Sequence, residues 1–174
     1  METSQPGPPQ AVVDLGSGAG VPGLMLAARW ENSRFLLVDA QGRRAAFLLR
    51  AVRELGFDDR VAVVAERAEV LGRTPAKRGA FDLVTARGFG CPAVVAECAA
   101  PFLSVTGLLV VSEPPPDLNA DQQSRWSTQG LAQLGMGPPR PMGTDYRFVV
   151  MRQLEACPER LPRRVGVPAK RPLF

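Results

Sequence analysis

The sequence predicts an α/β fold, a mostly parallel sheet with helices on both faces. Between residues 10 and 112, short apolar runs alternate with longer amphipathic segments, which is the pattern of strands and helices in succession. The apolar runs are continuous, as expected of strands that are covered on both faces. A length of 174 residues with 45% hydrophobic and 22% charged residues is typical of one globular domain.

The expected elements are rich in Val, Leu and Phe and are bounded by Gly, Pro or charged residues. The strands are Ala11–Leu15, Phe35–Asp39, Val61–Ala65, Phe81–Ala86 and Leu108–Ser112, and the helices between them are Pro22–Trp30, Gly42–Gly56 and Pro92–Leu103. The second helix has an apolar stripe at helical spacing that includes Phe47, Leu48 and Leu55, so we expect it to pack on the sheet.

The pattern changes after Ser112, because Glu113-Pro114-Pro115-Pro116 cannot continue a central strand. We expect an exposed loop there, followed by a helix over 121–134 and a last strand over 146–151. The proline- and glycine-rich stretch 135–143 reads as a turn or flexible connector.

Charge and composition divide the chain into three parts. Residues 1–10 are polar and proline-rich, and we expect them to be disordered ahead of a catalytic domain over 11–154. Residues 155–174 form a basic tail that carries a net charge of +3 out of the chain's +4. Such a tail either meets a polyanion or is a solvated terminus. No apolar run is long enough to span a membrane and the start does not resemble a signal peptide, so we expect a cytoplasmic protein.

The chain has three cysteines and no histidine. Cys91, Cys98 and Cys157 lack metal-ligand spacing, so we expect reduced thiols and no metal site. Without histidine the usual general base near neutral pH is missing, which disfavours chemistry that depends on strong proton abstraction.

A glycine-rich turn follows the first expected strand. It reads Asp14-Leu15-Gly16-Ser17-Gly18-Ala19-Gly20-Val21-Pro22-Gly23. Glycines at alternate positions let the backbone turn sharply and approach a ligand where a side chain would collide. Pro22 suits the first turn of a helix, and Gly23 allows helix and strand to pack closely. We therefore expect a nest of backbone N–H groups at a helix start.

Two cofactors compete for this turn. Gly18, Gly20 and Gly23 fit G-x-G-x-x-G, which alone is only a weak sign of a dinucleotide. Asp14 precedes that pattern and would bring a carboxylate to the mouth of a pyrophosphate site, where two anions repel. S-adenosylmethionine has an ammonium group and a positively charged sulfur instead. The turn therefore favours S-adenosylmethionine, with a dinucleotide as the alternative.

Further polar residues follow the next three strands and should reach the same edge of the sheet. Asp39 either accepts the ribose hydroxyls or caps the following helix. Glu69 belongs either to the site or to a helix surface, and Arg87 is either an orienting group or part of a structural ion pair. Cys91 is expected at a helix start and not as a nucleophile.

These residues resemble the glucose-inhibited division protein B family, bacterial methyltransferases that modify guanine N7 in small-subunit ribosomal RNA. The likeness rests on Asp14 to Gly23, Asp39 with Arg43-Arg44, Arg67-Ala68-Glu69, Ala86-Arg87 and the closing Pro162-Arg163-Arg164-Val165-Gly166-Val167-Pro168-Ala169-Lys170-Arg171-Pro172-Leu173. It covers most of the chain from Ala11 onward and thins between Glu113 and Asp145. The resemblance implies a Rossmann-like class I methyltransferase with a mostly parallel seven-stranded sheet.

Together, the residue patterns and the resemblance give a candidate cofactor site: Asp14, Gly16, Gly18, Gly20, Val21, Asp39, Ala68, Glu69 and Arg87. The resemblance implies that Gly16 and Val21 contact the methionine part of S-adenosylmethionine. It implies that Asp39 binds the ribose and that Ala68-Glu69 lies on the adenine side.

Arg87 is the one catalytic candidate, as an orienting group, and the resemblance places it against the cofactor or the target base. Guanine N7 has a lone pair in the ring plane and needs no deprotonation, which agrees with the lack of histidine. Positioning would then supply most of the rate.

The implied partner is ribosomal RNA or the small ribosomal subunit. The RNA-binding candidates are Arg163, Arg164, Lys170 and Arg171. Gly166 and Pro168 space these cations, so we expect an extended strip instead of a regular helix.

Two departures from the family limit the resemblance. Members usually have a helical segment before the first strand, which we do not find in this sequence. Members also tend to have Lys-Gly where this chain has Glu113-Pro114, so we expect weakened or redirected substrate binding. The alternatives are a small-molecule methyltransferase and a cofactor-binding or ribosome-associated module without catalysis. A dinucleotide-dependent oxidoreductase is more distant.

Overall fold

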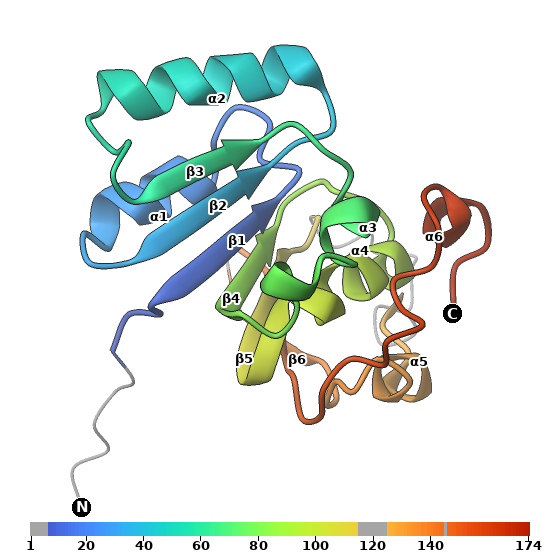
Figure 1. The fold of residues 1–174 in the computed structure, drawn as a ribbon. Helices are drawn as coiled ribbons and strands as arrows, with labels where there is room; N and C mark the ends of the chain where they lie inside the picture. Colours follow the sequence, from blue (N-terminus) through green and yellow to red (C-terminus); the bar gives the residue numbers. More distant parts are fainter. Residues whose placement is uncertain (1–6, 115–124, 145) are drawn as a thin grey trace, which may run out of the picture.

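The computed structural model describes residues 7–114, 125–144 and 146–174. Its centre is one seven-stranded sheet with the order β3-β2-β1-β4-β5-β7-β6 (Figure 1). The strands are β1 (Ala11–Leu15), β2 (Arg34–Val38), β3 (Val61–Val64), β4 (Phe81–Ala86), β5 (Leu103–Ser112), β6 (Arg140–Met142) and β7 (Phe148–Arg152). Strands β3, β2, β1, β4 and β5 pair in parallel, whereas β7 runs antiparallel to both β5 and β6. The expected fold class is confirmed.

Helices lie on both faces of the sheet (Figure 1). They are α1 (Gly23–Arg29), α2 (Gly42–Glu54), α3 (Ala68–Leu71), α4 (Pro92–Ala99), α5 (Thr128–Ala132) and α6 (Val167–Lys170), with 3₁₀ turns η1 (Pro75–Lys77) and η2 (Ala100–Phe102). Helices α1 and α2 share one face, while α4 and α5 pack on the other. Among the described helices, none is long and apolar enough to cross a bilayer.

Helix α2 packs on the sheet as its apolar stripe predicts. Leu48 and Val52 are buried with Phe35 and Leu37 of β2 in the core on the α1 and α2 side. The stripe is narrower than expected, because Phe47 and Leu55 are exposed.

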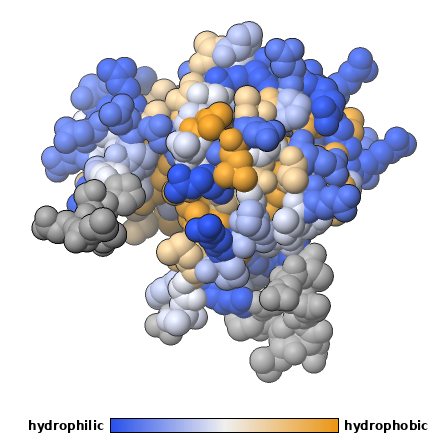
Figure 2. All heavy atoms as spheres, turned by 90° about the horizontal axis from the view of Figure 1, so that it is seen from below, coloured by the Kyte–Doolittle hydropathy of each residue, from blue (hydrophilic) through white to orange (hydrophobic). Residues whose placement is uncertain are grey.

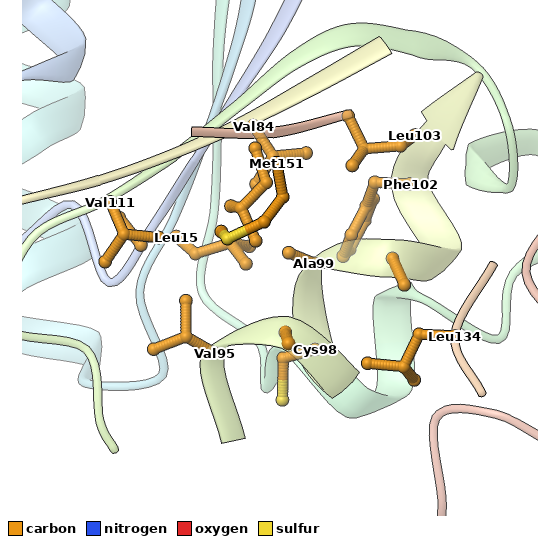
Figure 3. Close-up of a cluster of buried hydrophobic side chains, with 14 of the residues drawn as sticks. Leu15, Val84, Val95, Cys98, Ala99, Phe102, Leu103, Val111, Leu134 and Met151 are labelled. Carbon is orange, nitrogen blue, oxygen red and sulfur yellow. The ribbon is translucent and has the colours of Figure 1, made fainter. Parts of the chain in front are cut away.

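Helix α4 is buried almost all round because it lies between the sheet and the chain that follows β7. Figure 3 shows its residues Val95 and Ala99 facing side chains of the sheet, whereas the Cys98 sulfur points away from the sheet. The apolar surroundings raise the pKa of the Cys98 thiol, which disfavours its reactive thiolate form. The cysteines are free, as expected; Cys91 is exposed and precedes α4.

The boundary between α4 and β5 differs from the expected one. A helix over 92–103 is wrong, because α4 ends at Ala99 and η2 leads into a strand that begins at Leu103. Pro101 has no backbone N–H, so it cannot donate the hydrogen bond that would continue the helix.

The connector expected over 135–143 contains the edge strand β6. Pro141 sits in this strand, where it pairs with Val149 of β7. Proline is tolerated on an edge strand because its missing N–H faces away from the ladder. The three-residue strand is exposed throughout, so it leaves no hydrophobic pattern in the sequence.

Two expected segments extend beyond the described residues. Of the helix expected over 121–134, residues 121–124 lie outside the description, and α5 covers only Thr128–Ala132, capped by the Ser127 hydroxyl. Of the segment expected to be disordered, residues 1–6 lie outside the description. For residues 9 and 10 the expectation of disorder is wrong, because both are held by hydrogen bonds. The Gln10 N–H donates to Asp82, and the Ser33 hydroxyl donates to the Pro9 carbonyl.

Candidate cofactor and substrate site

The candidate site lies where the order of the sheet reverses. Strand β1 pairs with β2 on one side and with β4 on the other, and both pairings are parallel (Figure 1). Loops that follow such strands leave the same sheet edge in opposite directions and open a crevice between them. Residues 16–22 and 87–91 border this crevice.

The glycine turn is built as the sequence predicts. Gly16 and Gly18 have φ angles of +65° and +54°, a region that favours glycine. A Cβ on Gly16 would lie 2.9 Å from the Phe89 ring, whereas a Cβ on Gly18 would meet no atom closer than 3.7 Å. The turn is therefore packed at Gly16 and open at Gly18. Gly20 closes it by donating its N–H to the Ser17 carbonyl at 2.7 Å.

Asp39 follows β2 directly and holds the glycine turn by a hydrogen bond. Its Oδ2 accepts the Gly18 N–H at 2.9 Å, and its Oδ1 accepts the Gln41 N–H at 2.8 Å. The bond to Gln41 stabilises the turn into α2, but Gln41 itself is the N-cap residue of that helix. Asp39 is thus no simple helix cap. It joins the glycine turn to the loop between β2 and α2.

Asp14 does not lie at the mouth of the site, so that expectation is wrong. Its side chain is fully buried, where Oδ1 accepts the Thr85 hydroxyl at 2.7 Å and Oδ2 accepts the Gly23 N–H at 3.2 Å. Burial raises the pKa of Asp14 despite these bonds. The carboxylate therefore ties β1 to β4 and to the start of α1.

A cavity of about 170 Å³, the Glu69 cavity, adjoins the glycine turn. It brings together Gly16, Ala68 and Glu69, which the sequence had assigned to one site. Glu69 is only 5% exposed, so the reading as a surface helix carboxylate is wrong. The cavity also includes Phe89 and Ala169, which sequence reasoning missed.

Arg87 follows β4 and is exposed at the centre of the crevice. It borders the α1 cavity of about 640 Å³, which Val21, Leu26 and Phe148 also line. It also borders the Trp126 cavity of about 380 Å³, named for Trp126 in its lining. In the described parts of the chain Arg87 forms no salt bridge, so the reading as a structural ion pair is wrong there.

Glu113 lies at the end of β5 between these two cavities. Its carboxylate accepts hydrogen bonds from Arg125 at 2.5 Å and from the Trp126 indole N–H at 3.0 Å. The negative charge that departs from the family pattern is therefore paired with a cation.

The family model described as rRNA small subunit methyltransferase G matches residues 1–130. The chain belongs to this family. It is 35% identical over 168 residues to ribosomal RNA small subunit methyltransferase G of Prochlorococcus marinus strain NATL1A, covering 92% of this chain and 66% of that protein. The protein of the same name from Deinococcus deserti is 38% identical over 167 residues, covering 94% of this chain and 68% of the relative.

The chain spans about two thirds of the length of these curated relatives. Among solved structures, a SAM dependent methyltransferase from Aquifex aeolicus aligns with a TM-score of 0.61 at 18% identity, covering 84% of this chain and 82% of that one. The fold is that of class I methyltransferases, and the family suggested by the residue motifs is confirmed.

The basic tail does not form the expected extended strip. Arg163 donates its Nε and Nη2 to Glu97 at 2.8 and 2.6 Å, and Glu97 is fully buried in α4. The tail also contains the short helix α6, since Pro168 stands in its first turn, where the missing N–H costs nothing. Arg164, Lys170 and Arg171 are exposed.

No group of three or more Cys, Asp or Glu side chains suited to a metal ion gathers among the residues that the structure describes.

Proposed function

We propose that this chain transfers the methyl group of S-adenosylmethionine to N7 of a guanine in small-subunit ribosomal RNA. The observation that carries the proposal is the convergence of the glycine turn, Asp39, Glu69 and Arg87 around the reversal point of the sheet. Membership of the rRNA small subunit methyltransferase G family supports the RNA substrate. Ribosomal RNA as substrate also supports a cytoplasmic location and the small subunit as partner.

The site's geometry fits an adenosine-containing cofactor. Space is open above Gly18, where a Cβ would meet no atom within 3.7 Å. Asp39, which accepts the Gly18 N–H, would accept ribose hydroxyls there, and the Glu69 cavity would take the adenine. Gly16 and Val21 would line the methionine part. This assignment of residues to parts of the cofactor is our proposal.

The residues around Arg87 suit methylation of a ring nitrogen. Bound S-adenosylmethionine supplies an electrophilic methyl group on a positively charged sulfur, which becomes a neutral thioether when the N7–carbon bond forms. The guanine needs no general base, and the chain has no histidine to act as one. Arg87 would orient the base by hydrogen bonds from its exposed guanidinium.

The test is methylation of intact small subunits that lack the modification. Incubation with S-adenosylmethionine should add one methyl group to a guanine, and borohydride reduction followed by aniline should then cleave the RNA at that N7-methylated base. An Arg87→Ala variant should bind cofactor but methylate slowly, while Gly18→Val should lose cofactor binding. Absence of methylation together with normal cofactor affinity would favour a non-catalytic binding module.

One observation favours a second candidate, a small-molecule methyltransferase. The α1 cavity of about 640 Å³ has the size of a small-ligand site and is lined by apolar residues such as Leu26, Trp30 and Phe148. Methylation of free nucleosides and small metabolites, but not of ribosomal subunits, would support it. If NAD bound in competition with S-adenosylmethionine, the result would instead support the alternative of a dinucleotide-dependent oxidoreductase.

A further inference from the structure

The C-terminal segment, residues 161–174, is built into the domain. It starts at the buried Leu161 and ends at Phe174, which packs against α5. The packing at its end is close, because a Cβ on Gly130 of α5 would overlap the Phe174 ring. Between these points, α6 lies beside α4 (Figure 1).

Two acidic side chains fasten this segment from inside the domain. Glu97 accepts three hydrogen bonds from Arg163, one from the backbone N–H at 2.8 Å and two from the guanidinium. These bonds raise the pKa of Arg163. A fully buried carboxylate without such a partner would be costly, so Glu97 requires the segment to stay in place.

The second acidic side chain is Glu69, which borders the proposed adenine site. Its Oε1 accepts the Gly166 N–H at 3.1 Å. Three residues later, Ala169 lines the Glu69 cavity together with Gly16 and Phe89. The segment therefore closes one side of a cavity whose other walls come from β2, from the loops after β1, β2, β3 and β4, and from α4.

We propose that Gly166 and Ala169 of this segment form a wall of the cofactor site and set its fit for the adenine ring. This inference rests on the proposed function, which places the adenine in the Glu69 cavity. The basic tail then serves the cofactor site as well as RNA binding. Replacing Arg163 would disturb the cofactor site, because Arg163 fastens this segment to Glu97. We expect Ala169 to be the specificity-determining position, because it is exposed and lies in the lining of the cavity.

The test compares Ala169→Leu with Val165→Leu by calorimetric titration with S-adenosylhomocysteine. Val165 is an exposed residue of the same segment and is outside the cavity lining, which makes it the matched control. Ala169→Leu should raise the dissociation constant by about tenfold or more, because its three additional carbon atoms would occupy space that the proposal assigns to the adenine ring. Val165→Leu should bind as the unmodified chain does.

Hydrogen exchange gives a second readout. The Gly166 N–H donates to Glu69, and the Lys170 N–H donates to the Gly166 carbonyl. Binding of S-adenosylhomocysteine against this wall should therefore slow the exchange of both groups. Equal affinities of Ala169→Leu and the unmodified chain, with unchanged exchange in the segment, would overturn the inference while leaving the proposed function standing. A lack of binding by the unmodified, folded chain would overturn both.

Discussion

At the residue scale, the Asp39 carboxylate holds two loops of the protein together, and our proposed function assigns ribose binding to the same group. Both oxygens already accept backbone N–H groups, those of Gly18 and Gln41. A carboxylate oxygen has further lone pairs, so it can accept a hydroxyl without releasing these bonds. The two readings from the sequence, ribose acceptor or local structural group, are therefore compatible.

We predict that Asp39→Ala weakens binding of S-adenosylhomocysteine by about 1 to 3 kcal/mol, because the ribose hydroxyls lose their acceptor. The free energy of unfolding should also fall, by about 1 to 2 kcal/mol, since the Gly18 and Gln41 N–H groups lose theirs. Calorimetric titration and urea denaturation measure the two effects separately. Normal affinity in a destabilised variant would leave Asp39 with the structural task alone.

Asp14 carries a pH dependence whose direction follows from burial. Its folded-state pKa lies above the ordinary value of 3.8, because the buried site disfavours the charged form. Folding therefore favours the protonated form of Asp14, which adds to the stability of the fold at low pH. That contribution to stability disappears as pH rises from about 4 through the raised pKa.

We predict that Asp14→Asn, which cannot ionise, gains stability relative to the unmodified chain as pH rises through this range. The difference between their free energies of unfolding should change steadily above about pH 4 and become constant once Asp14 is fully ionised. Denaturation curves for both proteins at a series of pH values give this difference, in which the other titrating groups largely cancel. A difference that is flat across the range contradicts the raised pKa.

At the scale of elements, the sequence predicted what hydrophobic patterns and local turn chemistry determine. Strands β1 to β4 and helices α1 and α2 were expected within one or two residues of their bounds, because each has a buried stripe or run. Strand β6 was missed because its exposed residues and Pro141 show no such pattern. The β5 start was misplaced because Ala100–Phe102 is as apolar as the helix before it.

For the site, loop positions could be predicted but contacts between distant segments could not. The order of strands brings Gly16, Asp39 and Glu69 to one edge, as the sequence indicated. Nothing local in the sequence shows that Gly166 reaches Glu69 or that Arg163 reaches Glu97. One signal was present: Glu97 interrupts an otherwise apolar helix, and a buried acid needs a cationic partner.

The ion pair between β5 and the chain before α5 supports a further prediction. Glu113→Lys should lower the free energy of unfolding by about 1 to 2 kcal/mol, because it removes hydrogen bonds to Arg125 and Trp126 and places two cations together. The double variant Glu113→Lys with Arg125→Glu should recover part of that loss. Urea denaturation of the single and double variants forms a mutant cycle, and strict additivity would mean that the two side chains do not interact.

At the scale of the whole molecule, the sheet offers two unlike surfaces beside the crevice. On the α4 side, the C-terminal segment seals the core and carries exposed cations. On the α1 side, the α1 cavity lies next to Arg87, with apolar side chains in its lining. Elsewhere on the surface, the face turned downward in Figure 1 shows hydrophobic patches near its middle with hydrophilic residues around them (Figure 2).

The distribution of charge bears on how RNA would meet this molecule. Residues 155–174 contribute a net charge of +3 to a chain total of +4. Arg163 is committed to Glu97, which leaves Arg164, Lys170 and Arg171 exposed on the segment that also walls the Glu69 cavity. RNA phosphates on these cations would thus lie close to the cofactor site.

We predict that replacing Arg164, Lys170 and Arg171 by alanine weakens RNA binding at low salt and lowers its salt dependence. Each phosphate contact that is lost should reduce the slope of log affinity against log salt by about 0.7 to 0.9. Filter binding of a small-subunit RNA fragment across a salt series measures this slope. Arg163 stays in place, so the fold and the wall of the cavity are preserved, and S-adenosylhomocysteine affinity should not change. If the two salt series superimpose, the three cations do not contact phosphates, and the C-terminal segment serves the cofactor site alone.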